Sequence, residues 1–308
     1  MTTMMVATLG GHISELVHLD DRLPDDDRIW VAPRCLQTED LLADRRVEWV
    51  PEVRERDYLG VARAGGQARL LYRRLGVDRV ISSGSAIALG YLPVAAAMGI
   101  EAHYIECATR IDTVSVTGRI LSRVPGVRCW WQYGVTPPGF ARVGGVYDRY
   151  RVGQRSTPAE FKRIVVTVGT TDWDFRRLIE RLVEIIPADA DVLWQTGASS
   201  VGHLDINAQA MVPESLLRQA MADADVVIGH AGAGTLGLSL ECGRSPVLVP
   251  RRAAHREQID DHQIELARWA SDQGLAVWAE ADEVTLSDLV EAASRDVAVT
   301  SAPALSLT

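Results

Sequence analysis

A glycine-rich turn in the second half of the chain has the residue types that bind anions. The apolar stretch Val226–Ile228 precedes the turn Gly229–Gly234, and a predicted helix leads to a second apolar strand, Val247–Val249. The glycines let a ligand approach the backbone closely. The amide groups of Ala233–Leu236 would point outward from a helix N-terminus, where unpaired N–H groups and the helix dipole attract negative charge. The pattern therefore favours binding of a nucleotide diphosphate, although a plain strand-to-helix turn would need small residues too.

A histidine near the N-terminus occupies a similar position between a strand and a helix. Met4–Leu9 is a short apolar strand that ends in Gly10, Gly11 and His12, and Ile13–Leu19 has helical spacing. In an open parallel sheet, ligands bind beyond the carboxyl ends of the strands. A histidine at that edge can act as a base near neutral pH. His12 is therefore a candidate base, and a role in capping the helix explains its position equally well.

Two further segments of the first half follow predicted strands. Ser83–Ala86 is a second turn of small residues, which opens the predicted helix Ile87–Met98. The polar stretch Glu106–Arg119 follows the strand Glu101–Ile105 and includes Arg110. It predicts an acceptor pocket in which an arginine meets a phosphate. The alternative is a structural loop that contains an Arg–Glu pair.

A polar cluster follows Pro250 in the second half. Its members can donate or accept hydrogen bonds, and they are Arg251, His255, Arg256, Glu257, His262 and Gln263. His255 and His262 are seven residues apart, as two turns of one helix would space them, which suggests a metal site. The acids between them and the amide of Gln263 fit hydrogen bonding to a sugar better. A solvated helix N-terminus is the third interpretation.

The segment Asp172–Asp174 has the DxD pattern of a metal site. It directly precedes an amphipathic stretch that begins at Phe175. We therefore expect one aspartate to cap that helix, and we expect no metal.

The elements that position these residues repeat a strand, turn and helix pattern, which indicates a parallel α/β sheet. The pattern restarts at Arg163–Val168, which is followed by the turn Gly169–Thr171. We therefore predict two α/β domains, residues 1–150 and 161–295, joined by a polar linker at 151–160 and followed by a frayed tail at 296–308. Tyr58–Leu75 has helical spacing with many arginines, and Gly65-Gly66 predicts a break into two helices or a mobile loop. Such a basic amphipathic stretch suits an anionic membrane surface, or an ordinary helix that packs on the core.

Composition excludes several classes of protein. The 308 residues are 47% hydrophobic and 24% charged, with a formal charge of −9. This negative charge argues against general binding of nucleic acid. The four cysteines have no zinc-type spacing, which indicates reduced thiols. The longest apolar run, Ile87–Ile100, is too short to span a bilayer. We expect a cytoplasmic protein that touches the inner face of the cell membrane only peripherally.

The motifs together resemble a known group of enzymes. The second half, with VTVGTTDWDF, HAGAGT, VLVPRR and DDHQIELA, resembles the donor domain of MurG-type family-28 glycosyltransferases. It is more similar to the catalytic subunit of the two-subunit UDP-GlcNAc transferase of dolichol-linked oligosaccharide assembly. The first half, with LGGH, SSGSAIAL and YIECATRIDTVSVTGR, resembles the acceptor subunit of that pair. Bacterial exopolysaccharide pairs such as PssD and PssE are similar, and here both halves lie in one chain.

This resemblance implies a GT-B fold, in which two Rossmann-like domains face each other across a cleft. It implies an inverting glycosyltransferase that needs no metal or other cofactor and moves a sugar from a UDP-sugar to a polyprenyl-phosphate-linked or other hydrophobic acceptor. It makes His12 the catalytic base. The donor would be bound by Gly169, Thr170, Thr171, His230, Gly232, Ala233, Gly234, Thr235, Arg251, Glu257, Asp261, His262 and Gln263. The acceptor would be bound by Gly11, Ser85, Glu106, Arg110 and Arg119.

One position departs from the family pattern. MurG-type enzymes carry a ribose-binding glutamate three residues after the Thr or Ser of the glycine turn, where this chain has Leu238. Glu241 lies nearly one turn further on. The departure favours the exopolysaccharide-type pairs. The alternatives to a glycan-assembling transferase are a UDP-sugar epimerase of GT-B fold, a non-catalytic GT-B scaffold subunit and a natural-product glycosyltransferase.

Overall fold

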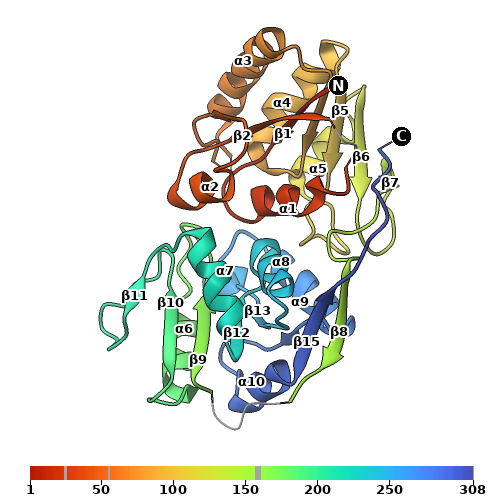
Figure 1. The fold of residues 1–308 in the computed structure, drawn as a ribbon. Helices are drawn as coiled ribbons and strands as arrows, with labels where there is room; N and C mark the ends of the chain where they lie inside the picture. The colour runs from red at the N-terminus through yellow and green to blue at the C-terminus, as the bar shows by residue number, and fades with distance from the viewer. Residues whose placement is uncertain (24–25, 55, 157–160, 308) are drawn as a thin grey trace. The chain divides into compact units, whose positions relative to one another are not determined.

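The computed structural model describes residues 1–23, 26–54, 56–156 and 161–307. It divides into two compact units (Figure 1). The first contains Met1–Asp148 and the C-terminal residues from Ala302 onward, and the second contains Arg149–Ser301. Both are α/β units built on a parallel sheet, as predicted.

The first unit has a seven-stranded sheet in the order β3-β2-β1-β4-β5-β6-β7. Every strand pair in it is parallel. Its strands are β1 (Thr2–Val6), β2 (Asp27–Ala32), β3 (Val47–Trp49), β4 (Arg79–Ser82), β5 (Glu101–Ile105), β6 (Val127–Trp131) and β7 (Phe140–Arg142). Its helices are α1 (Gly11–Asp20), α2 (Leu36–Leu41), α3 (Tyr58–Leu75), α4 (Ser85–Ala97) and α5 (Val116–Leu121). The strand order reverses between β1 and β4, which makes the gap between these strands the switch point of the sheet.

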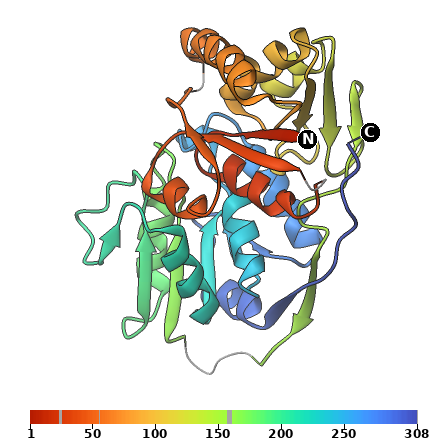
Figure 2. The same ribbon diagram turned by 45° about the horizontal axis from the view of Figure 1, so that its top comes forward.

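Helices cover both faces of this sheet. Figures 1 and 2 show α1 and α2 on one face and α3 and α4 on the other. Buried apolar side chains of β1, β2, β4 and β5 form the core beneath α3 and α4, including Met4, Ile29, Val80 and Tyr104. Alternating strand residues point to opposite faces of a sheet, so both faces of β1 are buried.

The predicted break at Gly65-Gly66 is wrong, because α3 runs unbroken from Tyr58 to Leu75. Gly65 on α3 and Gly90 on α4 allow these two helices to cross closely. A Cβ added to Gly90 would lie 2.8 Å from the Ala64 Cβ and 2.9 Å from the Val61 carbonyl oxygen. A Cβ on Gly65 would lie 3.3 Å from the Gly90 oxygen. The glycines therefore allow backbone contact between the helices and do not break the helix.

The second unit has a six-stranded parallel sheet in the order β11-β10-β9-β12-β13-β14. Its strands are β9 (Arg163–Thr167), β10 (Asp191–Gln195), β11 (Ala208–Gln209), β12 (Val226–His230), β13 (Val247–Val249) and β14 (Val277–Trp278). Its helices are α6 (Arg176–Ile185), α7 (Glu214–Asp223), α8 (Ala233–Glu241), the 3₁₀ turn η1 (Ala253–His255), α9 (His262–Asp272) and α10 (Leu286–Ala293). Here the strand order reverses between β9 and β12.

The predicted linker and tail form structure instead. The strand β8 (Tyr150–Gln154) pairs antiparallel with β15 (Arg295–Val299) to make a separate two-stranded sheet. The predicted linker at 151–160 therefore begins within a strand, and its residues 157–160 lie outside the described part of the chain. The chain then returns to the first unit, where Leu305 and Leu307 are buried and the Leu305 amide donates to the Arg22 oxygen at 2.7 Å. The frayed tail at 296–308 is thus corrected to a paired strand and a packed segment.

All four cysteines are free thiols, as predicted. Among the described residues, no helix is both long enough and apolar enough to cross a bilayer.

Candidate functional site

Each unit has a candidate site at the switch point of its own sheet. In the first unit, His12 follows β1 and Ser83 follows β4, so the two residues meet where the strand order reverses. The His12 Nδ1 lies 3.0 Å from the Ser83 carbonyl oxygen, and the Ser83 hydroxyl donates to the His12 oxygen at 2.8 Å. A carbonyl oxygen only accepts hydrogen bonds, so Nδ1 carries the proton. The neutral imidazole therefore keeps its lone pair on Nε2.

The turn beside His12 has an unusual backbone. Gly84 has φ 126°, and a Cβ there would lie 3.1 Å from the His12 Cε1. Ser85, the first residue of α4, has φ 67°, a left-handed conformation that costs a residue with a side chain about 1 kcal/mol or more. Gly11 is the first residue of α1. The residue before it, Gly10, has φ 73°. The structure thus brings Gly11 and His12 on α1 to the same edge as the turn that carries Ser85.

A buried carboxyl group lies next to His12. Glu15 is one helical turn further along α1 and is 1% exposed. It accepts hydrogen bonds from the Ala108 amide at 3.2 Å and from the Gln132 side chain. Burial, followed by the neighbouring Cys107, raises the pKa of Glu15 well above its usual value, while His12 opposes this shift. Burial also raises the pKa of the Cys107 thiol.

Glu106 has a structural role, and its predicted place in the acceptor pocket stays a prediction. Its side chain is 1% exposed. Its carboxylate accepts hydrogen bonds from the Tyr104 hydroxyl at 2.6 Å, the Cys107 amide at 3.1 Å and both the amide and the hydroxyl of Ser115. Ser115 in turn caps α5 by accepting from the Gly118 amide. Glu106 therefore fixes the polar stretch after β5.

The two predicted acceptor arginines lie in that stretch. Arg110 donates to the Thr113 hydroxyl at 3.2 Å. Arg119 lies on α5, and its Nε is 3.5 Å from the backbone carbonyl oxygen of Ser115. Arg119 is exposed, whereas Arg110 is half-buried. Their phosphate-binding role stays a prediction.

In the second unit, a histidine ring fills the switch point. His230 ends β12, and its imidazole lies between the turn after β9 and the glycine turn after β12. A Cβ added to Gly169 would lie 2.6 Å from the His230 Cε1, and one added to Gly232 would lie 2.3 Å from its Nε2. The His230 Nδ1 is 3.2 Å from the Thr235 hydroxyl oxygen. Burial, followed by the charge of Arg251, lowers the pKa of His230 to about 3. His230 is therefore neutral at physiological pH.

This packing changes the reason for the glycines. The sequence suggested that Gly232 makes room for a ligand, but the structure shows that both Gly169 and Gly232 make room for His230. The helix N-terminus is still present. Gly232 caps α8, and the Leu236 amide donates to the Gly232 oxygen at 3.0 Å. The amides of Gly234 and Thr235 belong to the first turn, where no acceptor exists within the helix.

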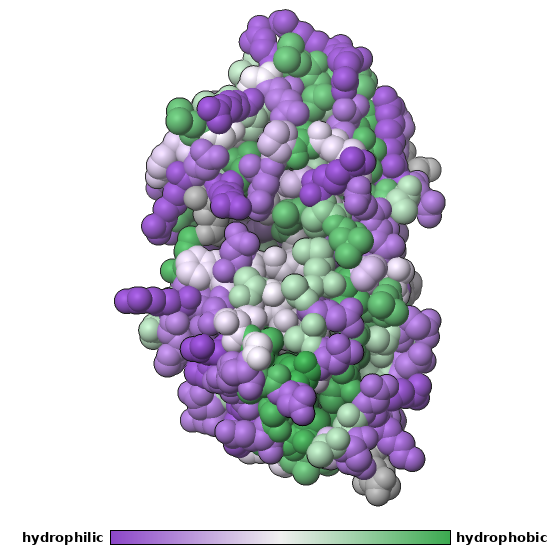
Figure 3. All heavy atoms as spheres, turned by 90° about the vertical axis from the view of Figure 1, so that its left-hand side faces the viewer, coloured by the Kyte–Doolittle hydropathy of each residue, from purple (hydrophilic) through white to green (hydrophobic). Residues whose placement is uncertain are grey.

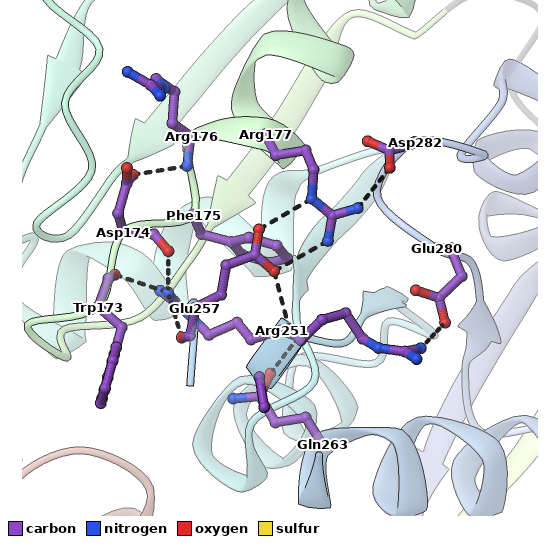
Figure 4. Close-up of polar contacts among 12 residues, drawn as sticks. Trp173, Asp174, Phe175, Arg176, Arg177, Arg251, Glu257, Gln263, Glu280 and Asp282 are labelled. Carbon is purple, nitrogen blue, oxygen red and sulfur yellow. Dashed lines mark hydrogen bonds and ion pairs between the residues drawn. The ribbon is translucent and has the colours of Figure 1, made fainter. Parts of the chain in front are cut away.

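Arg251 holds the surrounding loops together (Figure 4), and its predicted donor-binding role stays a prediction. It is fully buried. Its guanidinium donates to the backbone carbonyl oxygens of Val168 at 2.7 Å, Trp173 at 2.7 Å and Asp174 at 3.0 Å. A longer contact, at 3.4 Å, joins it to the backbone carbonyl oxygen of Glu257. The guanidinium carbon also lies 4.9 Å from the centre of the Phe175 ring. Burial lowers the pKa of Arg251 to about 10, so it stays charged at neutral pH.

Glu257 also supports the loops, and its predicted contact with the donor stays a prediction. It is 5% exposed and forms a double hydrogen bond with Arg177, with both distances 3.0 Å. It also accepts from the Arg252 amide at 3.0 Å. Arg177 reaches further to Asp282 at 2.8 Å. Arg177 and Glu257 therefore link α6 to the loop after β13, as Figure 4 shows.

The three remaining predicted sugar-binding residues lie at the start of α9. Gln263 is buried, and its Oε1 accepts from the Arg251 amide at 2.9 Å, so half of its amide group supports the loop. Asp261 accepts from the Ala253 amide at 2.9 Å, and His262 contacts Asp260 through Nδ1. His255 and His262 do not lie on one helix, because η1 contains His255 and α9 begins at His262.

The DxD segment lies directly before α6, whose N-cap residue is Phe175 and not an aspartate. The Asp174 Oδ1 accepts from the Arg176 amide, the first amide of α6, at 2.9 Å. In the turn just before it, Thr170 is half-buried and Thr171 is exposed.

The position of the family's ribose-binding glutamate faces the core in this unit. Leu238 is 3% exposed and packs with Val165, Leu217 and Met221. Glu241 forms an ion pair with Arg218 at 2.7 Å. Leu238 is therefore a core residue of the contact between α7 and α8.

Sequence reasoning missed three polar residues of these sites: Glu15, Gln132 and Arg177. The spacing of His12 and Glu15, three apart on one helix, was a signal that could have identified Glu15. Gln132 and Arg177 had no local signal, since their partners are far away in the chain.

Comparisons with known proteins agree with this architecture. Residues 163–303 match the glycosyltransferase family 28 C-terminal domain. Two curated relatives carry the name UDP-N-acetylglucosamine--N-acetylmuramyl-(pentapeptide) pyrophosphoryl-undecaprenol N-acetylglucosamine transferase. The protein from Polaromonas sp. strain JS666 is 28% identical over 232 residues, covering 70% of this chain and 58% of its own. The protein from Nitratidesulfovibrio vulgaris strain DP4 is 28% identical over 253 residues, covering 75% and 66%.

Solved structures show the same fold. Acinetobacter baumannii MurG has a TM-score of 0.57 at 20% identity, covering 94% of this chain and 88% of its own. The glycosyltransferase SnogD from Streptomyces nogalater has a TM-score of 0.58 at 18% identity, covering 94% and 90%. The chain spans less than two thirds of the length of the curated relatives it matches. The chain thus has the GT-B fold of two Rossmann-like units, and its match to the glycosyltransferase family 28 C-terminal domain lies at residues 163–303, almost all of them in the second unit.

Proposed function

We propose that this protein transfers a sugar from a UDP-sugar to a lipid-linked or other hydrophobic acceptor. The observation that carries the proposal is the family-28 match, because residues 163–303 include the glycine turn and every predicted donor-binding residue. The curated relatives are named as UDP-N-acetylglucosamine-dependent transferases, so UDP-N-acetylglucosamine is the first donor to test. The likeness of the two halves to PssD/PssE-type pairs supports a role in exopolysaccharide or other glycan assembly.

The second unit would hold the leaving group. The first-turn amides at Gly234 and Thr235 and the dipole of α8 suit the negative charge that develops on the departing diphosphate. Arg251 contributes indirectly, since it fixes the loop after β9 through the carbonyl groups of Val168 and Trp173. A helix N-terminus can stabilise this charge without a metal, and direct displacement at the anomeric carbon inverts its configuration.

The first unit would supply the base. In the proposed step, the acceptor oxygen attacks the anomeric carbon while the bond from that carbon to the UDP oxygen breaks. The electron pair of the broken bond stays on the diphosphate, and the acceptor proton moves to the His12 Nε2. The contact between Nδ1 and the Ser83 oxygen supports this role, because it leaves the Nε2 lone pair available.

His12→Ala tests this assignment. We expect kcat to fall by about 10²–10⁴-fold while UDP binding is unchanged, because the base acts only in the chemical step. His203→Ala is the matched control, since His203 is exposed and pairs with Glu180 on the second unit. Near-normal turnover in His12→Ala would exclude His12 as the base. Loss of turnover on EDTA treatment, restored by a divalent cation, would contradict the metal-independent mechanism.

The acceptor side of the assay also separates the alternatives. Conversion of a UDP-sugar without any acceptor would indicate an epimerase. Tight UDP binding without transfer to a lipid fraction would indicate a scaffold subunit. Transfer to a soluble aglycone in preference to polyprenyl phosphates would indicate a natural-product transferase.

A surface of the first unit suits peripheral contact with an anionic membrane at its cytoplasmic face. On α3, Tyr58 is 81%, Leu59 71% and Leu70 69% exposed. Arginines at 63, 69, 73 and 74 are exposed on the same helix. Figure 3 shows hydrophobic and strongly hydrophilic side chains next to one another in its upper part, over the first unit.

Vesicle sedimentation tests this contact. We expect binding to phosphatidylglycerol vesicles, and a loss of about 1 kcal/mol of binding free energy for each of Arg69→Glu and Arg73→Glu. Arg176→Glu, an exposed arginine of the second unit, is the control. Equal binding to phosphatidylcholine vesicles would contradict an electrostatic contact.

A further inference from the structure

We propose that His12, Glu15 and Cys107 form a binding site for a thiophilic divalent cation such as Zn²⁺. The proposal concerns binding itself. Only its consequence for turnover rests on the proposed function of His12.

The three side chains converge from two elements. His12 and Glu15 lie one turn apart on α1, and Cys107 lies just after β5. One ligand atom from each residue lies within 4.8 Å of the other two. Zn²⁺ binds nitrogen, oxygen and sulfur at about 2.0–2.3 Å, which places tetrahedral ligands roughly 3.3–3.8 Å apart. Side-chain movements of about 1 Å would close the site.

Each ligand is already oriented by a second residue. The His12 Nδ1 faces the Ser83 oxygen at 3.0 Å, so Nε2 is the nitrogen with a lone pair for a metal. The Thr109 hydroxyl donates to the Cys107 sulfur at 3.3 Å. Metal ligands in proteins are commonly held by such outer hydrogen bonds, which fix their tautomer and direction.

Gln132 fixes the carboxyl group of Glu15. The Gln132 Oε1 accepts from the Val146 amide at 2.9 Å, and an amide N–H can only donate. The Gln132 Nε2 must therefore face the other side. There it donates to the backbone carbonyl oxygen of Glu106 at 2.8 Å and to the Glu15 Oε1. This orientation leaves lone pairs on both Glu15 oxygens for a cation.

The donor set indicates the class of ion. A thiolate and an imidazole favour Zn²⁺ and similar transition metals, whereas Mg²⁺ and Ca²⁺ prefer oxygen ligands only. Three protein ligands leave a fourth position open. Because the metal would occupy the His12 Nε2, it would compete with the acceptor proton, so Zn²⁺ is expected to inhibit the transferase.

Cobalt(II) titration of the metal-free protein tests the site without donor or acceptor. We expect a thiolate-to-cobalt charge-transfer band in the near ultraviolet, absent in Cys107→Ser and retained in Cys242→Ser, a half-buried thiol of the second unit. In calorimetric Zn²⁺ titrations, we expect Cys107→Ser and Glu15→Gln each to weaken binding by at least about tenfold. Thermal unfolding of each variant confirms that it is folded. Absence of the thiolate band, or unchanged Zn²⁺ affinity in both folded variants, would overturn the proposal.

The activity assay then tests the consequence. Zn²⁺ should inhibit the wild type competitively with the acceptor, whereas Cys107→Ser should keep basal activity and resist Zn²⁺. A cobalt band without inhibition would support the metal site and contradict the base role of His12, so the two proposals fail separately.

Discussion

Two switch points, one in each unit, place a histidine against glycines in similar ways but bury different polar side chains. In the first unit, His12 packs against Gly84, and two buried carboxyl groups, Glu15 and Glu106, accept hydrogen bonds from the surrounding loops. In the second unit, His230 packs against Gly169 and Gly232, and a buried guanidinium donates to loop carbonyl groups.

The difference follows from which backbone groups each set of loops leaves unpaired. The loops of the first unit present N–H groups inward, such as those of Ala108 and Ser115, and a carboxylate pairs with them. The loops of the second unit present carbonyl groups inward, such as those of Val168 and Trp173, and an arginine pairs with them. Buried polar groups must be paired, so the backbone groups that the loops present determine which polar side chain is buried at each site.

Removal of the buried arginine is the strongest test of this comparison. We expect Arg251→Ala to lower the free energy of unfolding by about 3–5 kcal/mol, because several buried carbonyl groups lose their donor. Urea denaturation measures this change. Arg252→Ala is the matched control, since Arg252 forms a partly exposed pair with Glu280 and should cost about 0–1 kcal/mol. Equal costs for the two variants would show that Arg251 does not organise the loops.

Leu238 tests whether α8 presents this position to the core or to a ligand. We expect Leu238→Ala to cost about 2–5 kcal/mol of stability, as buried leucines do, with donor affinity of the folded protein unchanged. Leu216→Ala is the control, because Leu216 is 50% exposed on α7. Weaker UDP binding at unchanged stability would instead place Leu238 at the ribose.

The contact between Gly232 and His230 can be tested by a double-mutant cycle. Gly232→Ala places a Cβ 2.3 Å from the His230 Nε2, so we expect a loss of about 1–3 kcal/mol. His230→Ala should remove most of that penalty in the double variant. Gly202→Ala, where a Cβ meets nothing within 4 Å, is the control. Additive losses of stability from the two substitutions would show that the cost of Gly232→Ala does not depend on His230.

Acid stability extends the comparison to a buried histidine of the first unit. Burial, and then the charge of Arg79, lower the pKa of His103 to about 4. The unfolded chain therefore binds more protons than the folded one between about pH 4 and 6.5. The free energy of unfolding therefore decreases as the pH is lowered through this window, by up to ~1.4 kcal/mol per pH unit. His103→Gln should flatten this slope in urea titrations. An unchanged slope in that variant, as expected for the exposed His203→Gln, would contradict the assignment.

Most elements of both sheets could be predicted from the sequence. The strands at Glu101–Ile105 and Val247–Val249 match the prediction residue by residue. Apolar runs and glycine turns are local signals, and parallel strands bring their carboxyl ends to one edge. The position of His12 at that edge followed from this logic alone.

The direction and partner of each polar side chain were decided only by the tertiary structure. Gln132 is 117 residues from Glu15, and Arg251 is 83 residues from Val168. No local pattern records such pairs, which is why the sequence did not predict that Arg251, Glu257 and Glu106 hold loops. The segment after residue 295 gave no periodic signal either, because β15 is fixed by pairing with β8, more than a hundred residues earlier. The sequence thus determined where the two sites lie, and packing between distant segments determined which side chains remain available in them.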